Sequence, residues 1–139
     1  MATTSWCRLP GTGDDLDLRS GNAGQELDRN CAKVVAGGQT ARFELTSPGG
    51  TFVGGLVAFV FEVYRTDGPR PLQLLPGIQV DRADSLVPVV GLAATGAQID
   101  VAIPQGYAGT VIRAQGLVIS PQTLGGFLGT SPAHDVTLQ

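Results

Sequence analysis

Three aspartates lie close together near the amino terminus, and clustered carboxylates are the ligands that a hard cation such as calcium prefers. Asp14, Asp15 and Asp17 stand within the segment GTGDDLDL, whose glycines indicate a turn. The spacing is not that of an EF-hand loop, and aspartate also favours turns because its side chain accepts hydrogen bonds from nearby backbone amides. Two hypotheses follow, a calcium site and the polar entrance to a strand, and the second is favoured.

A hydrolytic site would need a base beside a nucleophile, and His134 is the only histidine of the chain. Its neighbours Ser131 and Asp135 supply the residue types of a triad, but adjacent residues of a strand point to opposite faces. His134 and Asp135 are therefore not expected to meet through their side chains. The sequence predicts no catalytic residues and no enzyme, and we expect His134 to lie at a strand edge and bond to backbone.

Sugar-binding sandwiches use exposed aromatic rings as platforms, and the aromatic residues available here are few. Only Trp6, Tyr64 and Tyr107 have suitable side chains, in a chain that is 6% aromatic. We expect Trp6 to anchor the amino-terminal segment and the two tyrosines to cap the core with their hydroxyl groups in water. A carbohydrate platform is the weaker hypothesis.

Two cysteines, Cys7 and Cys31, bracket the segment that is rich in glycine and aspartate. In an oxidising compartment, such an even pair in a small domain predicts a disulfide bond. Closing this loop would contribute about 3 kcal/mol by restricting the unfolded chain. The alternative is two reduced, buried thiols.

The spacing of apolar residues alternates with period two along most of the chain, and turn sequences such as SPGG and TDGPRP separate the runs. About eight short strands of this kind predict an all-β fold, a two-sheet antiparallel β-sandwich with Greek-key or jelly-roll connections. The residues expected in its core are Leu16, Leu18, Phe43, Leu45, Val57, Phe59, Phe61, Val63, Ile99, Val101, Ile103, Ile112, Val118, Val136 and Leu138.

One strand, residues 55–65, is apolar on both faces. Opposite the inward residues it carries Leu56, Ala58 and Val60, with Glu62 as the only charge. A strand of this kind needs a second cover. We expect that cover to be the chain's own loops, such as LVPVVGL, or a neighbouring molecule, and we expect Glu62 to pair with Arg113 or Arg42 across strands.

Length and charge exclude several classes of protein. The 139 residues correspond to one domain, which we divide into an amino-terminal arm, 1–13, and a sandwich, 14–139. The formal net charge of −3 and the absence of a basic run argue against a nucleic-acid partner. The longest apolar run, GGLVAFVF, is too short for a membrane-spanning helix. The start, MATTSW, lacks the features of a signal peptide, so we expect a mature form.

Five stretches, in this order, resemble an uncharacterised module of predicted secreted bacterial proteins: GTGDDLDL, FELTSPGGTFVGG, LPGIQVD, IPQGYAGTVIRAQGLVI and AHDVTL. The resemblance covers about residues 7 to 139. It implies an extracellular β-sandwich and carries no catalytic residues with it.

Together these features predict an extracellular structural protein, a self-assembling subunit of a surface fibre or layer that forms by exchange of a strand or arm. The expected interface comprises Thr3, Trp6, Leu9, Leu56, Ala58 and Val60. The alternative is a carbohydrate- or calcium-dependent binding module of a secreted protein, with glycans as partners and calcium as the only cofactor. Candidate O-linked glycosylation sites are Thr3, Thr4 and Ser5.

Overall fold

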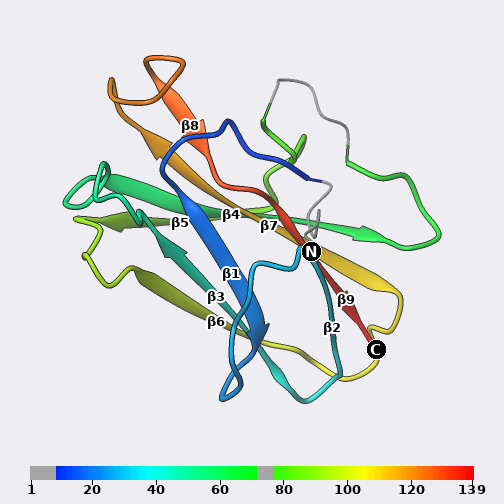
Figure 1. Ribbon diagram of the computed structural model, residues 1–139. Helices are drawn as coiled ribbons and strands as arrows, with labels where there is room; N and C mark the ends of the chain where they lie inside the picture. The colour runs from blue at the N-terminus through cyan, green and yellow to red at the C-terminus, as the bar shows by residue number, and fades with distance from the viewer. Residues whose placement is uncertain (1–8, 72–76) are drawn as a thin grey trace, which may run out of the picture.

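The computed structural model describes residues 9–71 and 77–139, and its strands form two sheets packed face to face (Figure 1). The all-β, two-sheet sandwich is confirmed. The strands are β1 (Asp17–Asn22), β2 (Ala32–Val35), β3 (Thr40–Thr46), β4 (Leu56–Arg65), β5 (Ser85–Val90), β6 (Ala97–Ala102), β7 (Thr110–Ile119), β8 (Leu128–Thr130) and β9 (His134–Leu138). Over the described ranges, no helix is long and apolar enough to cross a membrane.

The chain crosses repeatedly between the sheets. The smaller sheet has the order β1-β3-β6, and the larger has the order β2-β9-β7-β4-β5, with β8 paired to β7. Neighbouring strands are antiparallel except β2 and β9, which are parallel and depart from the antiparallel prediction. Parallel strands need a long crossover connection. Here the connection from β2 to β9 contains all the strands from β3 to β8.

The core lies between the sheets and consists of residues that the alternation places inward. Phe43 of β3 meets Phe61 of β4 edge to face, with 5.4 Å between ring centroids. The predicted residues in the buried cluster are Leu16, Leu18, Phe43, Leu45, Val57, Phe59, Phe61, Ile103, Val118, Val136 and Leu138. Ile99, Val101 and Ile112 are partly buried at its margin.

Val63 departs from the predicted core, since it is 41% exposed. It lies on β4 beyond Phe61, the last residue of that strand in the buried cluster. A three-stranded sheet cannot cover the whole inner face of a larger sheet, so an inward position near a strand end stays open to water.

The sheets approach closely at Gly116 of β7. A Cβ atom at this position would lie 2.3 Å from Cδ1 of Leu45 in β3, which is far inside van der Waals contact. Glycine therefore lets the fully buried Leu45 side chain pack directly on the backbone of the opposite sheet.

The outer face of the larger sheet is covered over part of its area by residues 77–82. This segment follows β4 in the sequence and lies across β4 and β7, to which it hydrogen-bonds. The expectation that LVPVVGL provides this cover is wrong, because that stretch forms β5 and extends the sheet beside β4.

Candidate interaction surface

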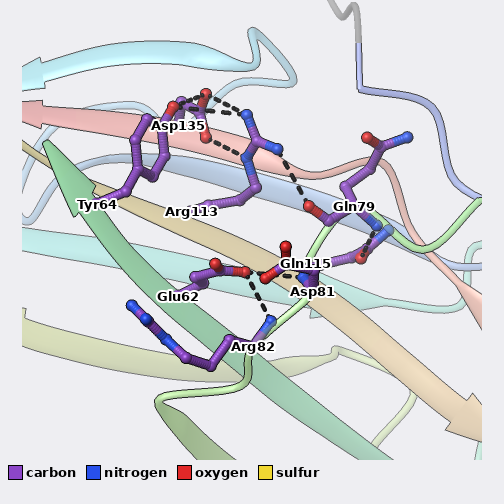
Figure 2. Close-up of polar contacts among 8 residues, drawn as sticks. All are labelled: Glu62, Tyr64, Gln79, Asp81, Arg82, Arg113, Gln115 and Asp135. Atoms are coloured by element: carbon purple, nitrogen blue, oxygen red, sulfur yellow. Dashed lines mark hydrogen bonds and ion pairs between the residues drawn. The ribbon is translucent and has the colours of Figure 1, made fainter. Parts of the chain in front are cut away.

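A buried ion pair lies on the outer face, under residues 77–82. Arg113 of β7 donates through Nε and Nη2 to the two carboxylate oxygens of Asp135 in β9, at 2.7 and 2.9 Å (Figure 2). The hydroxyl of Tyr64 donates to the same carboxylate at 2.7 Å. The guanidinium also stacks 5.4 Å from the Tyr64 ring and donates to the carbonyl of Gln79 at 3.1 Å.

Burial and the hydrogen bond to Asp135 raise the pKa of Tyr64 above its usual 10.0. The Tyr64 hydroxyl is thus neutral and bonded to Asp135, which corrects the expectation that it is free in water.

The neighbouring buried side chains bond to the covering segment instead of to one another. Gln115, fully buried, accepts from the amide of Gln79 at 3.0 Å (Figure 2). It also donates to the carbonyl of Gly77 at 2.7 Å. Glu62 accepts from the amides of Asp81 and Arg82 at 2.8 and 3.1 Å. Glu62 faces Arg113 across the strands, as predicted, but no ion pair links them, because each has a closer partner.

Glu62, Arg113 and Gln115, together with Tyr64 and Asp135, form a polar row on the outer face. Through its bonds to residues 77–82, this polar row anchors the covering segment to the sheet. Arg113 and Glu62 are each 4% exposed, so they are closed to a ligand. Sequence reasoning missed the row. The signal available was five polar residues on the outward side of β4, β7 and β9, beside a stretch whose sequence is typical of a loop.

Beyond this cover, the outer face is bare and aliphatic. The exposed fractions of its large side chains are 48% for Leu56, 53% for Leu86, 85% for Val90 and 53% for Ile119. We define the outer apolar surface as Leu56, Ala58, Leu86, Pro88, Val90, Leu117 and Ile119.

Strand pairing makes the outer apolar surface continuous. Leu56 lies opposite Val90, and Ala58 lies between Pro88 of β5 and Leu117 of β7. Six of its residues surround a shallow hollow of about 130 Å³ on the outer face of β4, β5 and β7. The start of β4 and the ends of β5 and β7 meet at one end of the sandwich (left in Figure 1). No charged residue lines the hollow among those described.

The predicted interface residues of β4 therefore divide into two groups. Leu56 and Ala58 belong to the outer apolar surface, whereas Val60 is 1% exposed and unavailable to a partner. The structure places Val60 opposite Leu86 and Gln115, at the border of the covered area. Gln115 bonds to the covering segment 77–82, and period-two patterning along β4 does not detect such a cover.

The three aspartates of the candidate calcium site bond to different parts of the chain. Asp14 accepts from the hydroxyl of Thr12 at 2.5 Å and from the amide of Leu124 at 2.7 Å. Asp17 pairs with Arg29 at 2.9 Å. In the described part of the chain, no three His, Cys, Asp or Glu side chains lie together as metal ligands.

Asp15 fixes the turn between β3 and β4. Its carboxylate accepts from the Ser47 hydroxyl and from the amides of Gly49 and Thr51, at 2.7 to 3.0 Å. Desolvation raises the pKa of Asp15, but these three donors outweigh it and lower the pKa from 3.8 to about 2. The contacts favour the structural interpretation of this carboxylate, and the calcium site stays a hypothesis.

His134 lies between the sheets, not at a strand edge as expected, because β9 is an inner strand between β2 and β7. Its Nδ1 lies 2.5 Å from Oγ of Ser20 in β1. Burial, helped by the nearby charge of Lys33, lowers the pKa of His134 from 6.5 to about 3, although the charges of Asp28 and Asp135 act to raise it. The distance suits a nucleophile and base, but exposures of 0% for Ser20 and 1% for His134 exclude a substrate from this pair.

The candidate sugar-binding aromatics do not form a platform in the described structure. Tyr64 bonds to Asp135, and Tyr107, 54% exposed, precedes the start of β7. The other strongly exposed ring, Phe127, follows the end of β7. Tyr107 and Phe127 therefore lie near opposite ends of a strand that is roughly 30 Å long. Trp6 lies outside the described residues.

The remaining arm predictions fall mostly outside the described residues, since Thr3, Thr4, Ser5, Trp6 and Cys7 all lie there. Leu9 is described, and its carbonyl accepts from the amide of Ala133 at 2.8 Å, so this part of the arm is fixed to its own domain.

The bond between Cys7 and Cys31 stays a prediction, and Cys31 is buried directly before β2. We expect mass spectrometry of non-reduced peptides to show the two cysteine peptides linked. Alkylation of both thiols in native, non-reduced protein would contradict the pairing.

Comparison with known proteins identifies no relative. No protein-family model, no curated protein and no solved structure matches the chain. The resemblance to the secreted bacterial module therefore stays a prediction.

Proposed function

We propose that the protein is an extracellular structural module that associates with copies of itself through its outer apolar surface. One observation carries the proposal. The chain covers part of the outer face of its larger sheet with its own residues 77–82 and leaves the adjoining part aliphatic and bare. Contiguous exposed patches of this kind commonly mark interaction sites.

The energetics support an association that uses most of this surface. Each 100 Å² of apolar surface removed from water contributes about 2.5 kcal/mol. Association itself costs about 4 to 15 kcal/mol in lost freedom of motion. A contact that covers only one or two of the side chains would therefore not persist, whereas coverage of the whole surface would.

The other side-chain clusters support a structural role. The Ser20–His134 pair is buried and the Arg113–Asp135 pair is largely buried, and both hold strands or loops together. A repeating subunit of a surface fibre or layer is the assembly that this proposal favours, with the amino-terminal arm as a second contact.

We expect a charge on the outer apolar surface to weaken association, and a matched charge elsewhere to leave it unchanged. Leu86→Asp places a carboxylate on this surface, and Val34→Asp places one on β2 at the opposite edge of the same sheet. The native side chains are 53% and 54% exposed, which matches the pair closely. Sedimentation velocity and electron microscopy of the native protein and both variants provide the measurement.

The expected result is concentration-dependent association of the native protein and of Val34→Asp, and its loss in Leu86→Asp. Circular dichroism and thermal melting confirm that both variants fold. A native protein that stays monomeric at all concentrations, or equal behaviour of the two variants, would contradict the proposed function.

A further inference from the structure

We infer that the partner at the outer apolar surface is a second copy of this chain, placed face to face around a twofold axis. The inference rests on the proposed self-association and adds the face-to-face geometry and the twofold symmetry of the contact. In such a pair, the same surface is buried on both molecules.

The chemistry of the surface favours a copy of itself. Its seven residues are aliphatic or proline, and it presents no charge and no side-chain hydrogen-bonding group of its own. A partner of different chemistry is usually selected by complementary charges. A surface without polar side chains is complementary to itself, because two copies bring no like charges and no unpaired donors together.

The adjoining charges do not oppose the pairing. Arg82 and Asp84 precede β5 and form an ion pair at 3.2 Å, so this border of the surface is locally neutral. Salt also screens the overall charge of −3 on each molecule at distances beyond about 8 Å.

Pro88 directs the contact to the face of the sheet and away from its edge. β5 is an edge strand, and a proline within a strand has no N–H to donate to an added strand. Proline on an edge strand is one of the devices that prevent edge-to-edge pairing. The β5 edge is therefore a poor acceptor for an exchanged strand, whereas the side chains on its outer face remain available.

The available area fits a pair of modest affinity. From the exposed fractions, the outer apolar surface offers roughly 500 Å² per molecule, so a face-to-face pair buries about 1,000 Å², the lower bound for a specific interface. We therefore expect a dissociation constant for the dimer between about 1 µM and 1 mM. The twofold contact is closed, and a filament would need a second contact elsewhere.

Two variants that carry opposite charges at Leu86 distinguish the twofold pair from a head-to-tail contact. Leu86→Glu alone and Leu86→Lys alone each place two like charges in a twofold interface, and we expect each to weaken pairing at least about 100-fold. An equimolar mixture of the two variants places opposite charges together, and we expect it to recover pairing. Sedimentation velocity on each variant and on the mixture measures the result, with Val34→Glu and Val34→Lys as controls.

Each outcome has one meaning. Native protein that reaches twice the 14.3 kDa chain mass and grows no further, with recovery in the mixture, supports the pair. Native protein that grows beyond the dimer without recovery in the mixture retains the proposed function and overturns the twofold inference, because a head-to-tail contact brings Leu86 against a different surface. Native protein that stays monomeric throughout overturns both.

Discussion

Replacing Asp135 with alanine is expected to lower the free energy of unfolding by about 3 to 5 kcal/mol. The change leaves the Arg113 guanidinium, whose side chain is 5% exposed, without its carboxylate partner. It also removes the acceptor of the Tyr64 hydroxyl. A buried charge without compensation is among the most destabilising defects in a folded protein, and urea denaturation measures its effect.

The chain contains a matched control for this prediction. Arg42 and Asp100 form a two-point ion pair across β3 and β6 at 2.8 and 2.9 Å, with nearly the same geometry as Arg113 and Asp135. Both of its side chains face water, so Asp100→Ala is expected to change stability far less. Equal destabilisation by the two substitutions would show that burial does not set the strength of the Arg113 pair.

The protein is expected to lose stability steadily as the pH falls below 6.5, because of His134. In the folded chain the pKa of His134 is about 3, whereas in the unfolded chain it returns to 6.5. Between these values the unfolded state binds a proton that the folded state does not, so stability is full above pH 6.5 and decreases below it. The slope is about 1.4 kcal/mol per pH unit, which gives a loss of about 2.5 kcal/mol between pH 7 and pH 4.5.

Several features isolate His134 in this experiment. It is the only histidine, and the lowered pKa values of Asp15, Asp28, Asp84 and Asp100 affect stability only near and below pH 3.8. The charges that act on the ring are Lys33, Asp28 and Asp135. His134→Gln should flatten the profile between pH 7 and pH 4.5, measured by urea denaturation at each pH.

NMR titration of the folded wild-type protein provides a second measurement that does not depend on the variant. The histidine ring signals should not shift between pH 7.5 and pH 5. A midpoint near 6.5 in the folded state would contradict the prediction.

The sequence predicts the inner half of this fold well. Leu18, Phe43 and Leu45 are buried, and Arg42 and Asp100 face outward, because strand geometry alone assigns alternate residues to opposite faces. That information is local, so two or three residues of alternation suffice to read it.

The outer half depends on contacts between distant residues, which local patterns do not contain. Val60 is buried and Leu56 is exposed, although they occupy the same face of one strand. The difference follows the covering segment 77–82. Val60 lies opposite Gln115, which bonds to that segment. Leu56, the first residue of β4, lies on the bare part of the face. To predict where the covered part of the outer face ends, one would need to know the path of the loop that contains residues 77–82.

The same limit applies to the ionisable residues. The sequence places His134 and Asp135 on opposite faces, as found, but Ser20 and Arg113 become their partners only through the strand order β2-β9-β7 and the packing of the two sheets. A sequence without an alignment of relatives gives no indication of that order. The residue types were visible in advance, but their pairing was not.

The position of β9 has a consequence for biosynthesis. β2, residues 32–35, joins the larger sheet only by pairing with residues 135–138 of β9. Closing a loop of this length costs about 4 kcal/mol of chain entropy. A ribosome adding about 5 to 20 residues per second needs roughly 5 to 20 s to make the intervening segment. During that time β2 has no partner in the larger sheet, so the nascent chain depends on protection from aggregation until β9 emerges.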